Sequence, residues 1–125
     1  MGSTGYNISR IDRIAPTATV SYSPNTNTNT DVTATLTASE AIQTPAGWTA
    51  VNSTTYTKDY PANTTETVTI TDLVGNTGTA NVAIARIDKT PVTGTITYDI
   101  TANTNTDVEA TITFNKTGVT VTNNG

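Results

Sequence analysis

Oxygen-bearing side chains at predicted turns are the part of this sequence with the clearest chemistry. Asp12 lies ahead of the first strand pattern, Glu40 follows a strand pattern, and Asp72 and Asn76 bracket a turn. Carboxylate and amide oxygens are the ligands that Ca²⁺ prefers, because it is a hard cation that accepts a flexible geometry. If the fold brings these segments together, the four residues form a calcium site.

A purely structural role is the competing interpretation of the same residues. Asp72 and Asn76 would cap their own turn, because short polar side chains bond to nearby backbone groups. Glu40 would then only form an ion pair with Arg13. The sequence has no calcium loop of the DxDxDG type, so the structural interpretation is favoured over calcium.

The composition excludes several other classes of site. The 125 residues contain no Cys and no His, which removes disulfides, thiol chemistry and the commonest general base. The acidic residues lie at turns and edges rather than around an obvious cleft, so we expect no enzyme and no required cofactor. A net charge of −4 without a basic cluster argues against a nucleic-acid partner. No apolar run is long enough to insert into a membrane.

Three aromatic residues leave two interpretations open. Trp48, Tyr56 and Tyr60 would form a carbohydrate-binding platform if their rings were exposed. At strand spacing, however, such rings are more often packed in the core. The ligand, if there is one, is not specified by the sequence.

Short alternating segments position these residues and indicate an all-β chain. In residues 32–38 apolar and polar side chains alternate, which is the pattern of a half-buried strand. Residues 80–86 show the same period of two, with Ala80, Val82 and Ile84 on one face and Asn81, Ala83 and Ala85 on the other. We expect about seven strands in residues 12–87, including a short one within residues 41–48. Two antiparallel sheets must then close over one core, because a single sheet would leave an apolar face in water.

The sequence also matches itself at an offset of 76 residues. The letters NTNTDV at residues 27–32 recur without a gap at residues 103–108. Apolar positions match as well, since Leu36 falls on Ile112. One offset serves the whole chain, and this indicates a tandem repeat.

The repeat divides the chain into three segments. Residues 1–11 match the last strand of a preceding unit. Residues 12–87 form one complete unit, and residues 88–125 form the N-terminal half of a second unit.

Three motifs resemble bacterial immunoglobulin-like repeats of long secreted and cell-surface, adhesin-type proteins. They are LTASE at residues 36–40, DLVGN at residues 72–76, and the Ile-Asp-(Arg/Lys) junctions at residues 11–13 and 87–89. The resemblance implies an immunoglobulin-like antiparallel β-sandwich, repeated about every 76 residues. It also implies an extracellular or cell-surface location, with signal and anchor outside this chain.

The topology of such a sandwich implies where the candidate ligands meet. In such a sandwich the chain entry, the loop after the second strand and the turn before the last strand lie at one end, so Asp12, Glu40, Asp72 and Asn76 would converge at the joint with a preceding repeat. Residue 116 matches Glu40 in the second unit, and it is Lys116. A lysine disfavours a cation and would pair with Asp88 instead.

Three functional hypotheses follow. The first is a structural stalk or spacer whose partners are neighbouring repeats. The second is a self-assembling extracellular filament, a homo-oligomer in which partial units are completed by strands of neighbouring chains. The third is a carbohydrate- or receptor-binding module.

Overall fold

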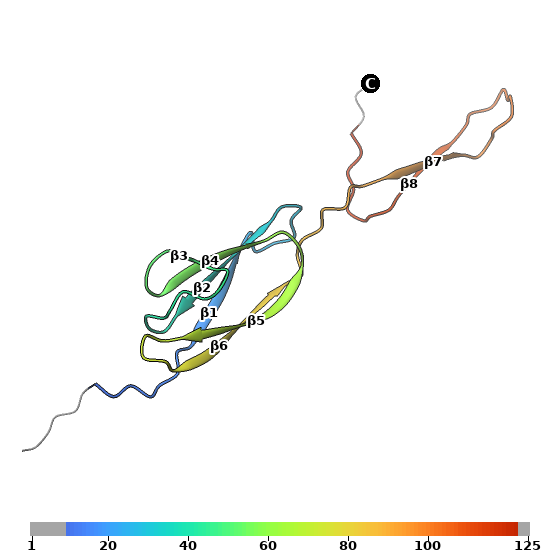
Figure 1. Ribbon diagram of the computed structural model, residues 1–125. Coiled ribbons are helices and arrows are strands. Elements are labelled where there is room, and N and C mark those ends of the chain that lie inside the picture. The colour runs from blue at the N-terminus through green and yellow to red at the C-terminus, as the bar shows by residue number, and fades with distance from the viewer. Residues whose placement is uncertain (1–9, 123–125) are drawn as a thin grey trace, which may run out of the picture. The chain divides into compact units, whose positions relative to one another are not determined.

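The computed structural model describes residues 10–122 of the chain (Figure 1). The described residues form antiparallel strands and no helix, which confirms the all-β prediction. They fall into two compact units that divide after Lys89. Most of the predicted terminal strand in residues 1–11 lies outside the described residues.

The first unit contains two sheets in its described part. Its strands are β1 (Ala18–Ser23), β2 (Val32–Ala38), β3 (Thr49–Ala50), β4 (Thr55–Tyr60), β5 (Thr64–Thr71) and β6 (Thr77–Ile84). One sheet has the order β1-β2-β4-β3, and β5 pairs with β6 in the other. Each paired strand runs antiparallel to its neighbour.

The core lies between these two sheets, and the alternating pattern of the sequence builds it. Along β2 every second residue from Val32 to Ala38 is buried, and β6 buries Ala80, Val82 and Ile84 in the same way. The buried cluster draws residues from both sheets, and β6 contacts β1 and β2. Thr side chains in β2 alternate with the buried residues and lie on the other face.

A glycine permits the close approach of β6 to the segment before β1. A Cβ atom on Gly78 would lie 2.1 Å from the carbonyl oxygen of Pro16, which is buried. Any side chain at this position would force the backbone apart, because real Cβ atoms do not approach a backbone oxygen so closely. Gly78 therefore fixes how the entry to β1 lies against the second sheet.

The short strand expected within residues 41–48 does not form. The structure has only an isolated antiparallel bridge there, between Ile42 and Asp72. Pro45 has no backbone N–H to give to a ladder, and Gly47 takes a positive φ of 83°. The Trp48 N–H closes this turn on the Pro45 carbonyl at 3.1 Å, so the segment bends instead of extending.

The described part of the second unit is a hairpin of β7 (Gly94–Tyr98) and β8 (Ala110–Phe114). Its sequence alternates as in the first unit, but its large apolar side chains are exposed. The exposed fractions are 53% for Ile96, 56% for Tyr98 and 43% for Ile112. The alternation of apolar and polar residues is therefore enough for the two strands to pair, but neither face of the hairpin is buried.

Candidate metal centre

Three carboxylates that the sequence singled out meet in the first unit. Asp12 comes from the segment before β1, Glu40 from the loop after β2, and Asp72 from the turn between β5 and β6. One oxygen of each lies within 4.8 Å of the others. We refer to these three residues as the carboxylate cluster.

The turn at residues 72–76 holds Asp72 in place. Its Oδ1 accepts hydrogen bonds of 2.9 Å from the backbone N–H groups of Val74 and Asn76. Gly75 closes the turn with a φ of 102°, a conformation that favours glycine. The side chain of Asp72 is consequently buried, with only 1% of the residue exposed.

The electrostatics of Asp72 favour its charged form. Burial by itself raises the pKa of the Asp72 carboxyl, but hydrogen bonds from Asn76 and from the turn backbone outweigh it. The net effect is a pKa below the ordinary 3.8, because donors stabilise the carboxylate more than the acid. This carboxylate is therefore charged at neutral pH.

Asn76 joins two segments of the site through its amide nitrogen. Its Nδ2 donates to Asp72 Oδ2 at 2.8 Å and to the carbonyl oxygen of Asp12 at 3.0 Å. The sequence led us to expect the amide oxygen as a cation ligand. Both neighbouring groups are acceptors, so the structure turns the donor toward them, and Asn76 orients Asp12 and Asp72.

Glu40 experiences the opposite environment. Its pKa is raised above the ordinary 4.5, first by burial, then by the charges of Asp12 and Asp72, and by a hydrogen bond with Asp12. The alternative pairing with Arg13 does not occur. Among the residues that the structure describes, no cationic side chain pairs with Glu40. Within residues 10–122 the cluster therefore gathers like charges without a lysine or arginine in an ion pair with it.

This arrangement fits a hard divalent cation. Ca²⁺ takes oxygen ligands at about 2.3–2.6 Å, so oxygens up to about 5 Å apart can bind one ion. The oxygens of the carboxylate cluster meet that condition. Softer metals are disfavoured, since the chain has no His or Cys to bind them.

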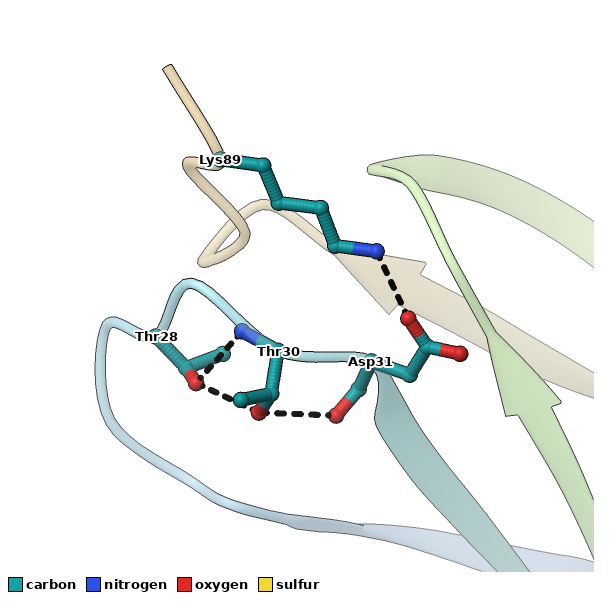
Figure 2. Close-up of polar contacts among 4 residues, drawn as sticks. All are labelled: Thr28, Thr30, Asp31 and Lys89. Carbon is teal, nitrogen blue, oxygen red and sulfur yellow. Dashed lines mark hydrogen bonds and ion pairs between the residues drawn. The ribbon is translucent and has the colours of Figure 1, made fainter. Parts of the chain in front are cut away.

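A second polar centre lies near the C-terminal end of the first unit, and it was not predicted from the sequence. We call residues 86–89 the junction segment. The Thr28 N–H donates to the Arg86 carbonyl at 2.8 Å, and the Asp88 N–H donates to the Thr28 carbonyl at 2.8 Å. Figure 2 shows Lys89 reaching across this turn to Asp31, with Nζ 2.6 Å from Oδ1. The junction segment is thus bound to the turn between β1 and β2.

Asn63 holds the same segment from another turn. Its Oδ1 accepts the Ile87 N–H at 2.8 Å, and its Nδ2 donates to the Ile87 carbonyl at 2.9 Å. By sequence alone Asp31 is a plain turn residue at the start of a strand pattern. Its partner Lys89 is distant in sequence, and only the recurrence of NTNTD together with Ile-Asp-(Arg/Lys) pointed to a connection.

The three aromatic rings do not form a binding platform. Trp48, Tyr56 and Tyr60 are 6%, 2% and 5% exposed, so the platform interpretation is wrong for these rings. Trp48 and Tyr60 pack edge to face, with ring centroids 6.5 Å apart. The Tyr56 hydroxyl donates to the Ile42 carbonyl inside the core.

The half-buried acid Glu66 is also occupied. Its carboxylate accepts hydrogen bonds from the Tyr60 hydroxyl and from Lys58 Nζ, the latter at 3.0 Å. These bonds lower the pKa of Glu66, and burial together with Glu66 raises the pKa of Tyr60. Lys58, Tyr60 and Glu66 therefore form a satisfied network that links β4 to β5.

Comparison of the chain with protein-family models, with curated proteins and with solved structures finds no match. Within residues 10–122 there is no helix long and apolar enough to cross a membrane.

Proposed function

We propose that this chain is a non-enzymatic, immunoglobulin-like β-sandwich repeat that serves as a stalk or spacer in a bacterial cell-surface or secreted protein. Ca²⁺ binds its carboxylate cluster, at the joint with a preceding repeat. The observation that carries the proposal is the approach of Asp12, Glu40 and Asp72 to within 4.8 Å without a cationic partner among the described residues.

The tandem arrangement is supported by the two hairpins. Ala18 pairs with Ala38 in the first unit, and the residues 76 positions later, Gly94 and Phe114, pair with each other in the second. Sequence match and strand register therefore agree, as expected for copies of one structural unit.

The surroundings of the cluster support a joint. Four large apolar side chains adjoin Asp12 and Asp72 in sequence and are mostly exposed: Ile11 at 63%, Ile14 at 74%, Leu73 at 67% and Val74 at 65%. Exposed apolar side chains that gather beside a polar centre favour contact with another domain. We expect a neighbouring repeat to cover them.

The same geometry argues against catalysis. Asp72 is 1% exposed and its oxygens already accept hydrogen bonds from the turn and from Asn76. A carboxylate in that state cannot reach a substrate. A structural ion needs only oxygen ligands at a suitable distance.

Thermal unfolding with Ca²⁺ and with EDTA tests the calcium site. Extracellular calcium modules bind with dissociation constants of about 10⁻⁴–10⁻³ M, so about 5 mM Ca²⁺ should raise the free energy of unfolding by about 1–2 kcal/mol. The melting temperature should rise by several degrees. Glu40→Lys, which installs the residue of the second unit, should remove most of that rise.

Glu109→Lys is the matched control, because it makes the same charge change on an exposed residue of the second unit. It should keep the calcium-dependent rise. An equal melting temperature of the unmodified chain in Ca²⁺ and EDTA would rule out the calcium site. A rise that Glu40→Lys leaves intact would place the ion elsewhere.

A second candidate function is association between copies of this chain. It is favoured by the exposed apolar residues of the β7–β8 hairpin, whose counterparts in the first unit are buried or half-buried. Light scattering on the eluting protein tests it. A constant monomer mass at all concentrations would exclude it.

A further inference from the structure

We propose that residues 103–107 of one chain bind residues 10–13 of a second copy of the same chain. We call residues 103–107 the tail turn and residues 10–13 the entry segment. The inference rests on the second candidate function, association between copies. It adds the surface, the partner segment and the contacts that join them.

The first unit contains the template for this contact. There the turn with the sequence NTNTD, at residues 27–31, holds the junction segment through a parallel bridge between Thr28 and Ile87. An ion pair of 2.6 Å between Lys89 and Asp31 closes it. The Arg86 guanidinium lies over the ring of Tyr22, 4.9 Å from its centroid.

The tail turn repeats two of the hydrogen bonds inside that turn. Thr104 and Thr106 join their hydroxyls at 2.8 Å, and the Thr106 N–H donates to Thr104 Oγ1 at 3.1 Å. The corresponding hydrogen bonds of Thr28 and Thr30, drawn as dashed lines in Figure 2, also measure 2.8 and 3.1 Å. The second copy of the turn is therefore already shaped to hold a junction segment.

The tail turn holds no such segment within the described part of this chain. Thr104 forms no β-bridge equivalent to that of Thr28, and Asp107 has no cationic partner there. Tyr98, which matches Tyr22, is 56% exposed and has no guanidinium over its ring. The groups that the template uses on and beside the turn, matched by Thr104, Asp107 and Tyr98, are therefore present and exposed.

The entry segment has the sequence that the template binds. Residues 10–13 read RIDR and residues 86–89 read RIDK, so the two differ only by an arginine in place of a lysine. Arg10 and Arg13 are exposed, and Ile11 is 63% exposed. Either basic residue at the last position complements an aspartate on the turn.

Asp12 can join two units at once. Its carbonyl accepts from Asn76 and its Oδ1 accepts from the Ile14 N–H, so both face its own unit. Among the described residues its backbone N–H donates to no group, and the matching N–H of Asp88 is the one that binds Thr28. The entry segment can therefore bind a tail turn without disturbing the carboxylate cluster.

The template assigns four contacts across the interface. The Thr104 N–H donates to the Arg10 carbonyl, and the Asp12 N–H donates to the Thr104 carbonyl. Arg13 pairs with Asp107, and the Arg10 guanidinium lies over the Tyr98 ring. Since every chain carries one entry segment and one tail turn, the contact is head to tail.

Sedimentation equilibrium of the full chain, from about 10 µM to about 1 mM at low salt, tests the contact. We expect the mean mass to rise with concentration and the association to weaken at high salt, because ion pairs on the surface are screened. Asp107→Arg and Arg13→Asp should each weaken association roughly fivefold. The double variant, which restores opposite charges, should recover it, and so should an equimolar mixture of the two single variants.

Glu109→Arg is the matched control, with the same charge change on the same hairpin, and it should associate like the unmodified chain. Tyr98→Ala tests the aromatic contact without involving charge, and it should weaken association. Circular dichroism checks that each variant is folded.

Two outcomes overturn the proposal in different ways. In the first outcome, the charge-reversal variants associate like the unmodified chain, but Ile96→Ser does not associate. The contact would then lie on the apolar face of the hairpin. The proposed contact would then be wrong, and association would remain. A monomer at every concentration would overturn both this contact and the second candidate function.

Discussion

The β1–β2 and β7–β8 hairpins have matching sequences and opposite environments. Both have the same strand register, and a hydrogen bond closes each at the same place, from Ser39 N–H to the Thr17 carbonyl and from Asn115 N–H to the Thr93 carbonyl. Leu36 is fully buried, however, while the matching Ile112 is 43% exposed. The pairing of two strands is thus encoded locally, and burial depends on what covers them.

In the first unit β6 packs against β1 and β2 while β4 extends their sheet, and no described residue provides such cover in the second. The same distinction applies to polar contacts. Asp31 has Lys89 as its partner, whereas Asp107 pairs with no cationic side chain in the described part of the chain. Matched substitutions in the two hairpins therefore separate local from long-range contributions.

The largest difference should appear between Leu36→Ala and Ile112→Ala. Removal of the buried Leu36 side chain should lower the free energy of unfolding by about 3 kcal/mol, since it deletes core contacts and leaves a cavity. Ile112→Ala should cost less than about 0.5 kcal/mol. Urea unfolding measures both losses, with the fluorescence of Trp48, the one tryptophan, for the first unit and circular dichroism for the strands of the second. Equal losses would show that the hairpins are buried alike.

A smaller difference is expected for the two matching tyrosines. The Tyr22 hydroxyl accepts the Ala83 N–H at 2.9 Å, so Tyr22→Phe should destabilise the first unit by about 1 kcal/mol. Tyr98→Phe should leave the unfolding midpoint unchanged, because no matching donor lies over Tyr98 in the described residues. The same urea titration checks both variants. An unchanged midpoint for Tyr22→Phe would mean that water replaces the bond without cost.

The ion pair should contribute less. Asp31→Asn should cost about 0.5 kcal/mol, since both side chains of the pair are about half exposed. That loss should disappear in about 1 M salt, and Asp107→Asn should show no loss at any salt concentration. Salt-dependent urea titrations of the two variants provide the measurement. A salt-independent loss would indicate that Asp31 acts through the backbone of its turn.

The smallest effect is a change in the pH dependence of stability at Glu40. Its raised pKa means that the folded state binds the proton more tightly than the unfolded state. The free energy of unfolding should therefore fall as the pH rises from 4.5 through the raised pKa, and Glu40→Gln should lack this fall. Asp72, whose pKa is lowered, loses its contribution only as the pH falls further, in both proteins.

Unfolding midpoints in EDTA between about pH 4 and pH 7 test this difference. Lys116→Gln changes the matching position of the second unit, and its curve should run parallel to that of the unmodified chain. Parallel curves for Glu40→Gln would mean that the carboxylate cluster exerts no net repulsion on Glu40.

The fold was predictable where the pattern is local. Alternation of apolar and polar residues located β2 and β6 and identified their buried faces. It failed within residues 41–48, because the proline and the glycine of that loop decide its backbone and the apolar spacing does not. The same alternation predicts that β7 and β8 form strands, but it does not predict that their apolar side chains are exposed.

The candidate site was predictable in part for a related reason. Turn residues at the ends of strands identified Asp12, Glu40 and Asp72, and the structure brings them together. The orientation of Asn76 depends on which acceptors surround it, and a sequence does not specify that. The pair of Lys89 and Asp31 joins residues 58 positions apart, so the alternation within strands does not indicate it, and only the recurrence of both motifs at the repeat offset does.

The attachment of the junction segment has a mechanical consequence. If the chain is pulled from both ends, tension on the first unit arrives at residues 86–89 before it reaches β6. The bonds of Ile87 to Asn63 and of Arg86 and Asp88 to Thr28 would take that load first. We therefore expect these bonds to break before the pulling force can separate β6 from β5.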